Sequence, residues 1–245
     1  MYLYLGSVPS VMMPCYQEAD NLKGILPKID EVLKKTEKDS EILIVDTMEP
    51  MDETEKICKE FQRELSTSIR YVPRRNGNNY GDAMRTGFVD ANGEYIVVMD
   101  ADGSHNPSDI SRLYDEIKDK KCGVVIGSRY VKGGDTNNPP ILKFMSHVLN
   151  IAYRILFHLN VKDVSDSYRI YDANKLKSVE LQCDNFDIVE EILIKLRFYY
   201  PDMDIREIPI YFDKRAYGKS KRDLVRFVFS YLKTIMRLKR IQRGL

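Results

Sequence analysis

The stretch Glu94-Tyr-Ile-Val-Val-Met-Asp100-Ala-Asp102 decides the fold of this chain. It is apolar from Tyr95 to Met99, which is typical of a strand buried on both faces of a parallel sheet. In such sheets ligands bind beyond the carboxyl ends of the strands, where Asp100 and Asp102 stand. Two carboxylates one residue apart can share one hard cation, such as Mg²⁺ or Mn²⁺. Acids are common in loops, so the position of this pair after a buried strand carries the prediction of a metal site.

The segments on either side alternate between strand and helix patterns. Glu41–Asp46 repeats the buried-strand pattern with an acid at its end, and residues 20–33 carry apolar side chains at helical spacing. This alternation predicts an α/β fold, a mostly parallel, Rossmann-like sheet with helices on both faces. Asp46 and Asp100 then lie at one edge of that sheet. The predicted strands are 10–13, 41–46, 68–72, 94–100 and 123–127, and the predicted helices are 20–33, 53–65, 80–91 and 107–118.

The composition narrows the class of protein. The 245 residues include 38 Lys and Arg against 37 Asp and Glu, a balance unlike that of proteins that coat nucleic acid, so we expect no nucleic-acid partner. The start of the chain lacks the basic flank and cleavage site of a secretory signal. Scattered cysteines without a CxxC pair argue against a disulfide framework or a zinc site, and we expect a cytoplasmic protein. These cysteines are Cys15, Cys58, Cys122 and Cys183.

Residues 141–160 form an apolar segment that polar residues interrupt every three or four positions. A transmembrane helix would not carry such a polar stripe. The pattern fits either an amphipathic helix at a membrane surface or an ordinary amphipathic core helix. The interrupting residues are Lys143, Ser146, His147, Asn150, Arg154 and His158.

The last segment, residues 219–245, is strongly basic and contains Asp223 as its only acid. Aromatic and aliphatic residues alternate with the basic ones, so the segment fits either a solvated cationic helix or a helix that rests on anionic lipid headgroups. No internal repeat or low-complexity linker separates it from the rest. We therefore predict a catalytic domain at 8–218 and a basic amphipathic extension at 219–245.

Five motifs occur in order along the chain, and together they resemble one known family. They are Pro14-Cys-Tyr16-Gln-Glu18, Asp100-Ala-Asp102-Gly-Ser-His-Asn-Pro107, Gly127-Ser-Arg129-Tyr130, Asp163-Val-Ser-Asp-Ser-Tyr-Arg169 and Arg215-Ala-Tyr-Gly-Lys-Ser-Lys221. From about residue 11 to residue 232 the chain is similar to family 2 glycosyltransferases of the dolichyl- or polyprenyl-phosphate mannosyltransferase type. The resemblance implies the GT-A form of the α/β fold and a hexosyltransferase that inverts the anomeric centre.

The resemblance also implies which residues bind the donor, a nucleotide-diphosphate sugar such as GDP-mannose or UDP-glucose. The metal, Mg²⁺ or Mn²⁺, would lie at Asp100 and Asp102 with Ser104 assisting. Asp102 and Arg129 are the expected catalytic residues, since Arg129 matches an arginine that faces phosphates. The expected donor-binding residues are Pro14, Tyr16, Glu18, Val45, Asp46, Thr47, Asp100, Ala101, Asp102, Arg129, Arg215 and Lys221.

The implied acceptor is polyprenyl or dolichyl phosphate at the cytosolic face of a membrane. A phosphate monoester loses its second proton with a pKa of about 6, so it is already ionised at neutral pH and needs no side-chain base. The resemblance places the protein as a peripheral one on the membrane surface, without transmembrane helices. The expected acceptor-binding residues are Ser146, His147, Asp166, Arg169 and Glu191.

The chain departs from the family pattern at three of these positions. Thr47 replaces the second of two consecutive acids, His147 stands where relatives tend to carry Arg, and Asp166 occupies a usual Gly position. Two alternatives therefore stay open. One is a family 2 transferase acting on a glycan or other hydroxyl acceptor, with Asp166 or Glu191 as base. The other is a non-catalytic membrane-associated scaffold.

Overall fold

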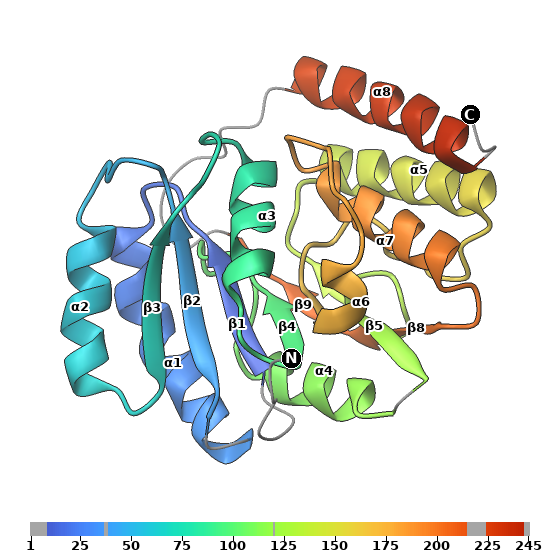
Figure 1. Cartoon of the computed structure of the whole chain (residues 1–245). Helices are drawn as coiled ribbons and strands as arrows, with labels where there is room; N and C mark the ends of the chain where they lie inside the picture. Colours follow the sequence, from blue (N-terminus) through green and yellow to red (C-terminus); the bar gives the residue numbers. More distant parts are fainter. Residues whose placement is uncertain (1–8, 37–38, 120, 215–223, 243–245) are drawn as a thin grey trace.

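The computed structural model describes residues 9–36, 39–119, 121–214 and 224–242. Its centre is a seven-stranded sheet in the order β3-β2-β1-β4-β7-β5-β8 (Figure 1). Every neighbouring pair is parallel except β4–β7 and β5–β7. A parallel pair, β6 and β9, forms a second small sheet. The strands are β1 Pro9–Pro14, β2 Glu41–Asp46, β3 Ser68–Pro73, β4 Tyr95–Val98, β5 Cys122–Ser128, β6 Asp135–Thr136, β7 Arg169–Asp172, β8 Asp204–Pro209 and β9 Tyr211–Phe212.

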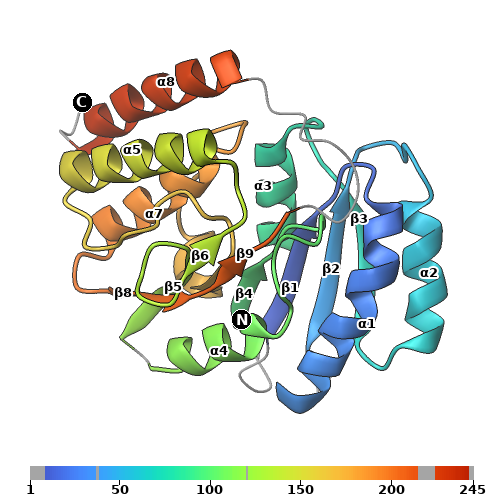
Figure 2. The ribbon, with the colours of Figure 1, turned by 180° about the vertical axis from the view of Figure 1, so that it is seen from behind.

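Helices cover both faces of the large sheet, so each strand alternates its side chains between two apolar cores. Figure 1 looks onto the face that carries α3, α6 and α7, and Figure 2 looks onto the face that carries α1 and α2. The second core includes α4 with α1 and α2. The helices are α1 Ala19–Thr36, α2 Thr54–Glu64, α3 Tyr80–Asp90, α4 Asp109–Ile117, α5 Pro140–Phe157, α6 Ala173–Lys177, α7 Ile188–Tyr199 and α8 Leu224–Gln242.

The predicted α/β fold and its first-half elements are confirmed, with ends that differ by at most three residues. The antiparallel strand β7 was not predicted, and neither were β8, the small sheet and the helices α6 and α7. Because β7 runs against its neighbours, its start lies at the edge where β4 and β5 end: Arg169 pairs with Val98 and with Ile126. This reversal brings residues 163–168 to the same edge as Asp100.

Helix α5 turns several large apolar side chains outward. Ile141, Phe144 and Ile155 are 63%, 65% and 68% exposed, whereas Asn150 and Tyr153 are buried. Tyr153 and Phe157 of the same helix belong to the core, and Leu149 and Leu156 pack against it, so α5 has apolar residues on both its inner and its outer side. A position at a membrane surface stays a prediction. Across the described residues, no helix combines the length and apolar character needed to cross a membrane.

Helix α8 lies alongside α5 in both views and packs over α7 (Figures 1 and 2). Tyr231 meets the ring of Tyr153 edge to face at 6.3 Å between centroids, and Lys239 donates to the Leu156 carbonyl. Leu232 and Met236 are outward and exposed. The predicted basic extension is therefore helical over most of its length, while the boundary predicted at residues 218 and 219 lies outside the described residues.

Candidate active site

The loop after β4 fixes the two predicted metal ligands. The Asp102 side chain is buried, and its Oδ1 accepts from the Ser104 amide at 3.0 Å and from the Ser104 hydroxyl at 2.5 Å. Gly103 makes this tight turn with a φ of 81°, a left-handed conformation that glycine adopts without a Cβ clash. Asp100 accepts from the Ser167 hydroxyl at 3.1 Å, which ties this loop to the segment before β7. Both carboxylates are therefore held in place by their own surroundings.

The donor atoms of this loop fit a hard divalent cation. Asp100, Asp102 and Ser104 offer only oxygen, which Mg²⁺ and Mn²⁺ prefer. Within the described residues no group of three or more His, Cys, Asp or Glu side chains comes together as a complete metal cage. A cation held here would thus take further ligands from water or from a bound phosphate, as Mg²⁺ usually does.

The ends of β1 and β2 lie at the same edge of the sheet as the loop after β4. Tyr16 is exposed and follows Pro14, while Glu18 accepts from Asn21 at 2.5 Å near the start of α1. Asp46 is buried and accepts from the Tyr71 hydroxyl at 3.1 Å through Oδ2. Burial raises the pKa of Asp46 above its ordinary value.

The buried Oδ1 of Asp46 has no hydrogen-bond partner of standard geometry among the described residues. A hydroxyl or N–H of a bound nucleotide could satisfy it. The hydroxyl of Thr47 differs from Asp46 Oδ1, because it already has a partner: it donates to the Glu49 carbonyl at 2.6 Å within the same loop. Val45 and Ala101 are buried in the apolar cores, so only their backbones can face a ligand.

Arg74 is a residue of this region that the sequence analysis missed. It donates to the carbonyls of Cys15 and Asn78, and its amide donates to the Asp46 carbonyl at 2.9 Å. It thereby fastens the loops after β1, β2 and β3 to one another. Nothing in the polar stretch after β3 distinguishes Arg74 from its neighbour Arg75, so the sequence held no signal for this role.

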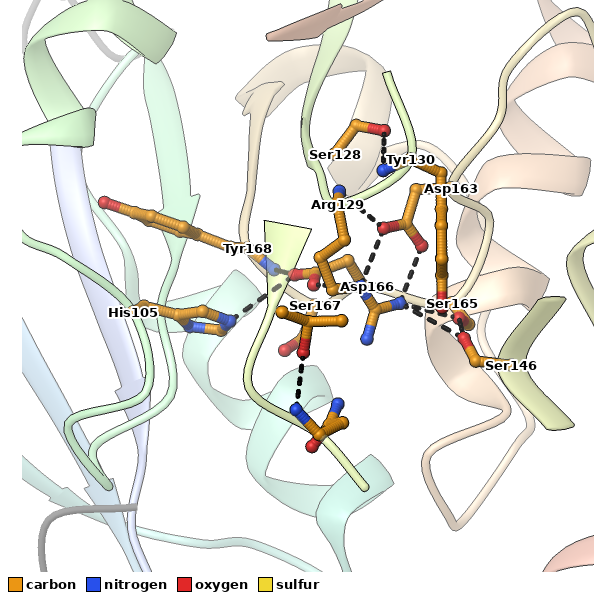
Figure 3. Close-up of polar contacts among 12 residues, drawn as sticks. His105, Ser128, Arg129, Tyr130, Ser146, Asp163, Ser165, Asp166, Ser167 and Tyr168 are labelled. Carbon is orange, nitrogen blue, oxygen red and sulfur yellow. Dashed lines mark hydrogen bonds and ion pairs between the residues drawn. The ribbon is translucent and has the colours of Figure 1, made fainter. Parts of the chain in front are cut away.

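The second polar centre surrounds Arg129, directly after β5 (Figure 3). Asp163 accepts from the Arg129 amide at 3.0 Å, from Nε at 2.8 Å and from Nη2 at 2.7 Å. Nη2 also donates to Ser165 at 2.9 Å and lies 3.5 Å from the Ser146 hydroxyl of α5. The two serine hydroxyls are 3.0 Å apart. A cation and two hydroxyls therefore meet beside the second turn of α5.

Asp166 links this centre to the loop of the metal ligands. Its Oδ2 lies 3.0 Å from Arg129 Nε, and its Oδ1 accepts from the Tyr168 amide at 2.8 Å and lies 3.4 Å from His105 Nε2. Burial raises the pKa of Asp166, but the charge of Arg129 and the hydrogen bond of His105 lower it further, to about 2. Burial likewise lowers the pKa of Arg129, and the charges of Asp163 and Asp166 raise it by more. Both groups are ionised.

Comparison with known proteins assigns the family. Residues 10–179 match the glycosyl transferase family 2 domain, which is more than half of the chain. The chain belongs to glycosyl transferase family 2. Two curated relatives support this. The dolichol-phosphate mannosyltransferase of Pyrococcus furiosus is 34% identical over 94% of this chain and 63% of its own length. The polyprenol monophosphomannose synthase of Mycolicibacterium smegmatis is 30% identical over 86% of this chain and 79% of its own.

The chain thus spans less than two thirds of the Pyrococcus relative. Solved structures confirm the GT-A fold of this family 2 chain. Glucosyl-3-phosphoglycerate synthase from Mycobacterium tuberculosis, in complex with Mn²⁺, UDP and glucosyl-3-phosphoglycerate, superposes with a TM-score of 0.70. The match covers 98% of this chain and 81% of that one at 15% identity. The same enzyme with Mg²⁺ and UDP gives a TM-score of 0.69.

The other predicted acceptor residues of the family 2 site are placed differently. His147 is exposed on α5 and meets the Tyr130 ring at 5.8 Å. Arg169 is fully buried and donates to the carbonyls of Val164 and Val189. Internal partners thus surround Arg169, and its role in acceptor binding stays a prediction.

Glu191 lies on α7, at the junction with α8. It is fully buried, pairs with Lys195 at 2.8 Å and accepts from the amides of Gln182 and Cys183. Among the described residues the structure does not bring it to the Asp100–Arg129 region. The predicted donor residues Arg215 and Lys221 lie outside the described residues.

The structure adds three residues that the sequence analysis named only within motifs: His105, Asp163 and Ser165. His105 Nδ1 accepts from the Asp100 amide at 3.1 Å, and its ring stacks on Tyr168 at 4.6 Å between centroids. All three stand in motifs quoted for the family, so the signal that could have found them was their position beside predicted residues.

Proposed function

We propose that this family 2 protein transfers a hexose from a nucleotide-diphosphate sugar to polyprenyl or dolichyl phosphate. The observation that carries the proposal is the position of Arg129, Ser146 and Ser165 beside α5, whose outward side is apolar. A guanidinium with two hydroxyls suits a phosphate, and an exposed apolar helix next to it suits a hydrocarbon chain. Polyprenyl phosphate combines those two chemistries in one molecule. The names of the two curated relatives agree with this acceptor.

The donor diphosphate would bind at Asp100 and Asp102, with its nucleotide at Tyr16, Glu18 and Asp46. A bound Mg²⁺ or Mn²⁺ would neutralise the charge that develops on the leaving diphosphate. The relatives named for mannose favour GDP-mannose, and the UDP complexes of the structural neighbour keep UDP-glucose as the second donor to test.

An ionised acceptor phosphate needs no general base, and the geometry agrees. The two side chains that could serve as bases for a hydroxyl acceptor are Asp166 and Glu191, and both are buried with cationic partners. The pKa of Asp166 is about 2, which makes it a poor proton acceptor. Direct attack of the phosphate on the face of the sugar opposite the diphosphate would invert the anomeric centre.

The same proposal places the protein at the cytosolic face of a membrane, with α5 and α8 against the lipid. Phe144, Ile155, Leu232 and Met236 are exposed, and α8 adds basic residues that anionic headgroups attract. Sedimentation with anionic liposomes tests this placement. Phe144→Asp with Ile155→Asp should reduce binding several-fold, whereas the control Val89→Asp, an exposed apolar residue on α3, should not. Equal binding of all three proteins would remove the membrane from the proposal.

The function itself is tested by sugar transfer with GDP-mannose or UDP-glucose, each with and without Mn²⁺. Polyprenyl phosphate and a polyprenol of the same length serve as acceptors. Metal-dependent transfer to the phosphate alone is the expected result. Transfer to hydroxyl acceptors alone would favour the glycan-type transferase. A protein that neither transfers nor hydrolyses any donor would be the non-catalytic scaffold.

A further inference from the structure

Two carboxylates lie against the Arg129 side chain, although one of them is enough to orient it. Asp163 alone fixes the side chain, because it accepts from the amide, Nε and Nη2 of Arg129. Asp166 then brings a second buried carboxylate to 3.0 Å from Nε. The nearest oxygen, Asp166 Oδ2, accepts no hydrogen bond of standard geometry within the described residues. The interaction of Asp166 with Arg129 is therefore mainly one of charge.

Asp166 also lies beside the ring of His105, which connects it to the loop of Asp100. A backbone amide can only donate, so the hydrogen bond from the Asp100 amide makes His105 Nδ1 an acceptor. The other ring nitrogen, Nε2, faces Asp166 Oδ1 at 3.4 Å. Counted as one guanidinium and two carboxylates, the group of Arg129, Asp163 and Asp166 carries one net negative charge.

An excess of negative charge beside an anion site has a consequence for the reaction. A guanidinium that is balanced by one carboxylate attracts a phosphate more strongly than one balanced by two. Strong attraction would stabilise the bound acceptor before reaction and withdraw charge from the oxygen that attacks the sugar. Tighter binding of the ground state lowers KM but does not raise kcat. A second carboxylate relieves both effects.

We infer that Asp166 is a positioning residue that sets the charge of the acceptor site, so that the acceptor phosphate binds weakly at Arg129 and keeps its nucleophilicity. This inference rests on the proposed function, because it takes the acceptor to be a phosphate monoester. Asp166 acts through Arg129 and touches the acceptor at no point. Asp163 has the opposite effect on binding, since without it Arg129 loses its three directional bonds.

The test compares wild type with Asp166→Asn, which keeps an oxygen for the Tyr168 amide and removes the charge. A short-chain polyprenyl monophosphate is the acceptor. The KM for it should fall on the order of tenfold, since one close charge is removed, and kcat should fall with it. Asp163→Asn should instead raise that KM. The control is Asp30→Asn. Asp30 is a buried carboxylate of α1 that accepts hydrogen bonds from Ser66 and Thr67, and its substitution should change neither KM nor kcat.

A direct binding measurement distinguishes a failure of this inference from a failure of the proposed function. The dissociation constant of the same monophosphate is measured by calorimetry on protein without donor. If wild type transfers no sugar to the lipid phosphate but Asp166→Asn binds it about tenfold tighter, the proposed function fails and the charge assignment stands. Unchanged or weaker binding in Asp166→Asn overturns the inference. Asp166→Ser, which also accepts from the Tyr168 amide without charge, replaces the asparagine variant if that protein does not fold.

Discussion

Glu190 on α7 gives the sharpest prediction about the stability of this protein. Its side chain is fully buried, and its two carboxylate oxygens lack a hydrogen-bond partner of standard geometry within the described residues. Arg169 of β7 and Tyr231 of α8 lie near it. The buried acid Asp187 and the neutral hydroxyl of Tyr153 are also close, and neither provides a positive charge. A buried carboxyl with so little compensation prefers to stay protonated.

The size of the effect follows from the pKa. Burial raises the pKa of Glu190 from its ordinary 4.5 to about 8, while the charge of Arg169 lowers it only in part. Each pH unit between the folded and unfolded pKa is worth about 1.4 kcal/mol. The native state holds the proton that the unfolded chain loses above pH 4.5, so the free energy of unfolding falls as the pH rises through this window. Up to about 5 kcal/mol is lost by pH 8.

The substitution Glu190→Gln removes the titrating group and keeps the shape. Urea unfolding of both proteins at pH 5, 6.5 and 8 should show the variant gaining stability over wild type steadily across the series, by several kcal/mol at the highest pH. The matched control is Glu41→Gln. Burial raises the pKa of Glu41, but hydrogen bonds from Ser10 and Arg70 lower it below 4.5, so its contribution is present above that pH and lost in acid.

The control should therefore be less stable than wild type at neutral pH. Parallel pH profiles for wild type and Glu190→Gln would refute the reasoning, because they would show that Glu190 is ionised or solvated in the native protein. A profile that diverges in the opposite direction would do the same.

Three further predictions concern the site and the packing. Asp102→Ala should abolish the stabilisation that a nucleotide sugar gives in the presence of Mn²⁺, with the melting temperature of the free protein changed little, and an intact shift would move the metal elsewhere. Leu238→Ala on α8 should cost about 2–5 kcal/mol of unfolding free energy, because this side chain is 1% exposed in the core, and a urea titration measures it. Gly81→Ala should destabilise by several kcal/mol or prevent folding, since its Cβ would lie 2.1 Å from the Cys183 carbonyl oxygen, and a variant as stable as wild type would contradict that close contact.

The sequence determined the first half of the fold and one part of the site. A buried strand can be recognised from the sequence, because an apolar run is a local property of the chain. An acid that follows such a strand lies at the carboxyl edge of a parallel sheet, where ligands bind. Asp100, Asp102 and Asp46 were predicted at one edge on that basis, and the strands that carry them are confirmed. The family resemblance, carried by five short motifs, is confirmed by the match over residues 10–179.

Local pattern could not reveal how the second half is arranged. The strand β7 is short and runs antiparallel between two parallel neighbours, so no periodicity indicated that Asp163 and Asp166 would reach Arg129. The sequence shows that α5 carries a polar stripe, but which of its side chains face solvent depends on the segments that pack against the helix. Here the side chain of Asn150 lies inside, where its Oδ1 accepts from the Val164 amide, while Ile141, Phe144 and Ile155 face outward.

The charges around Arg129 also depend on both the sequence and the tertiary structure. The sequence displays one arginine and two aspartates, but a count of charges fixes neither the pairing nor the burial. Distance and dielectric decide the strength of each interaction, and both are properties of the folded molecule. The sequence by itself thus determined which residue types were available at the sheet edge, and the tertiary structure decided which of them meet and with what net charge.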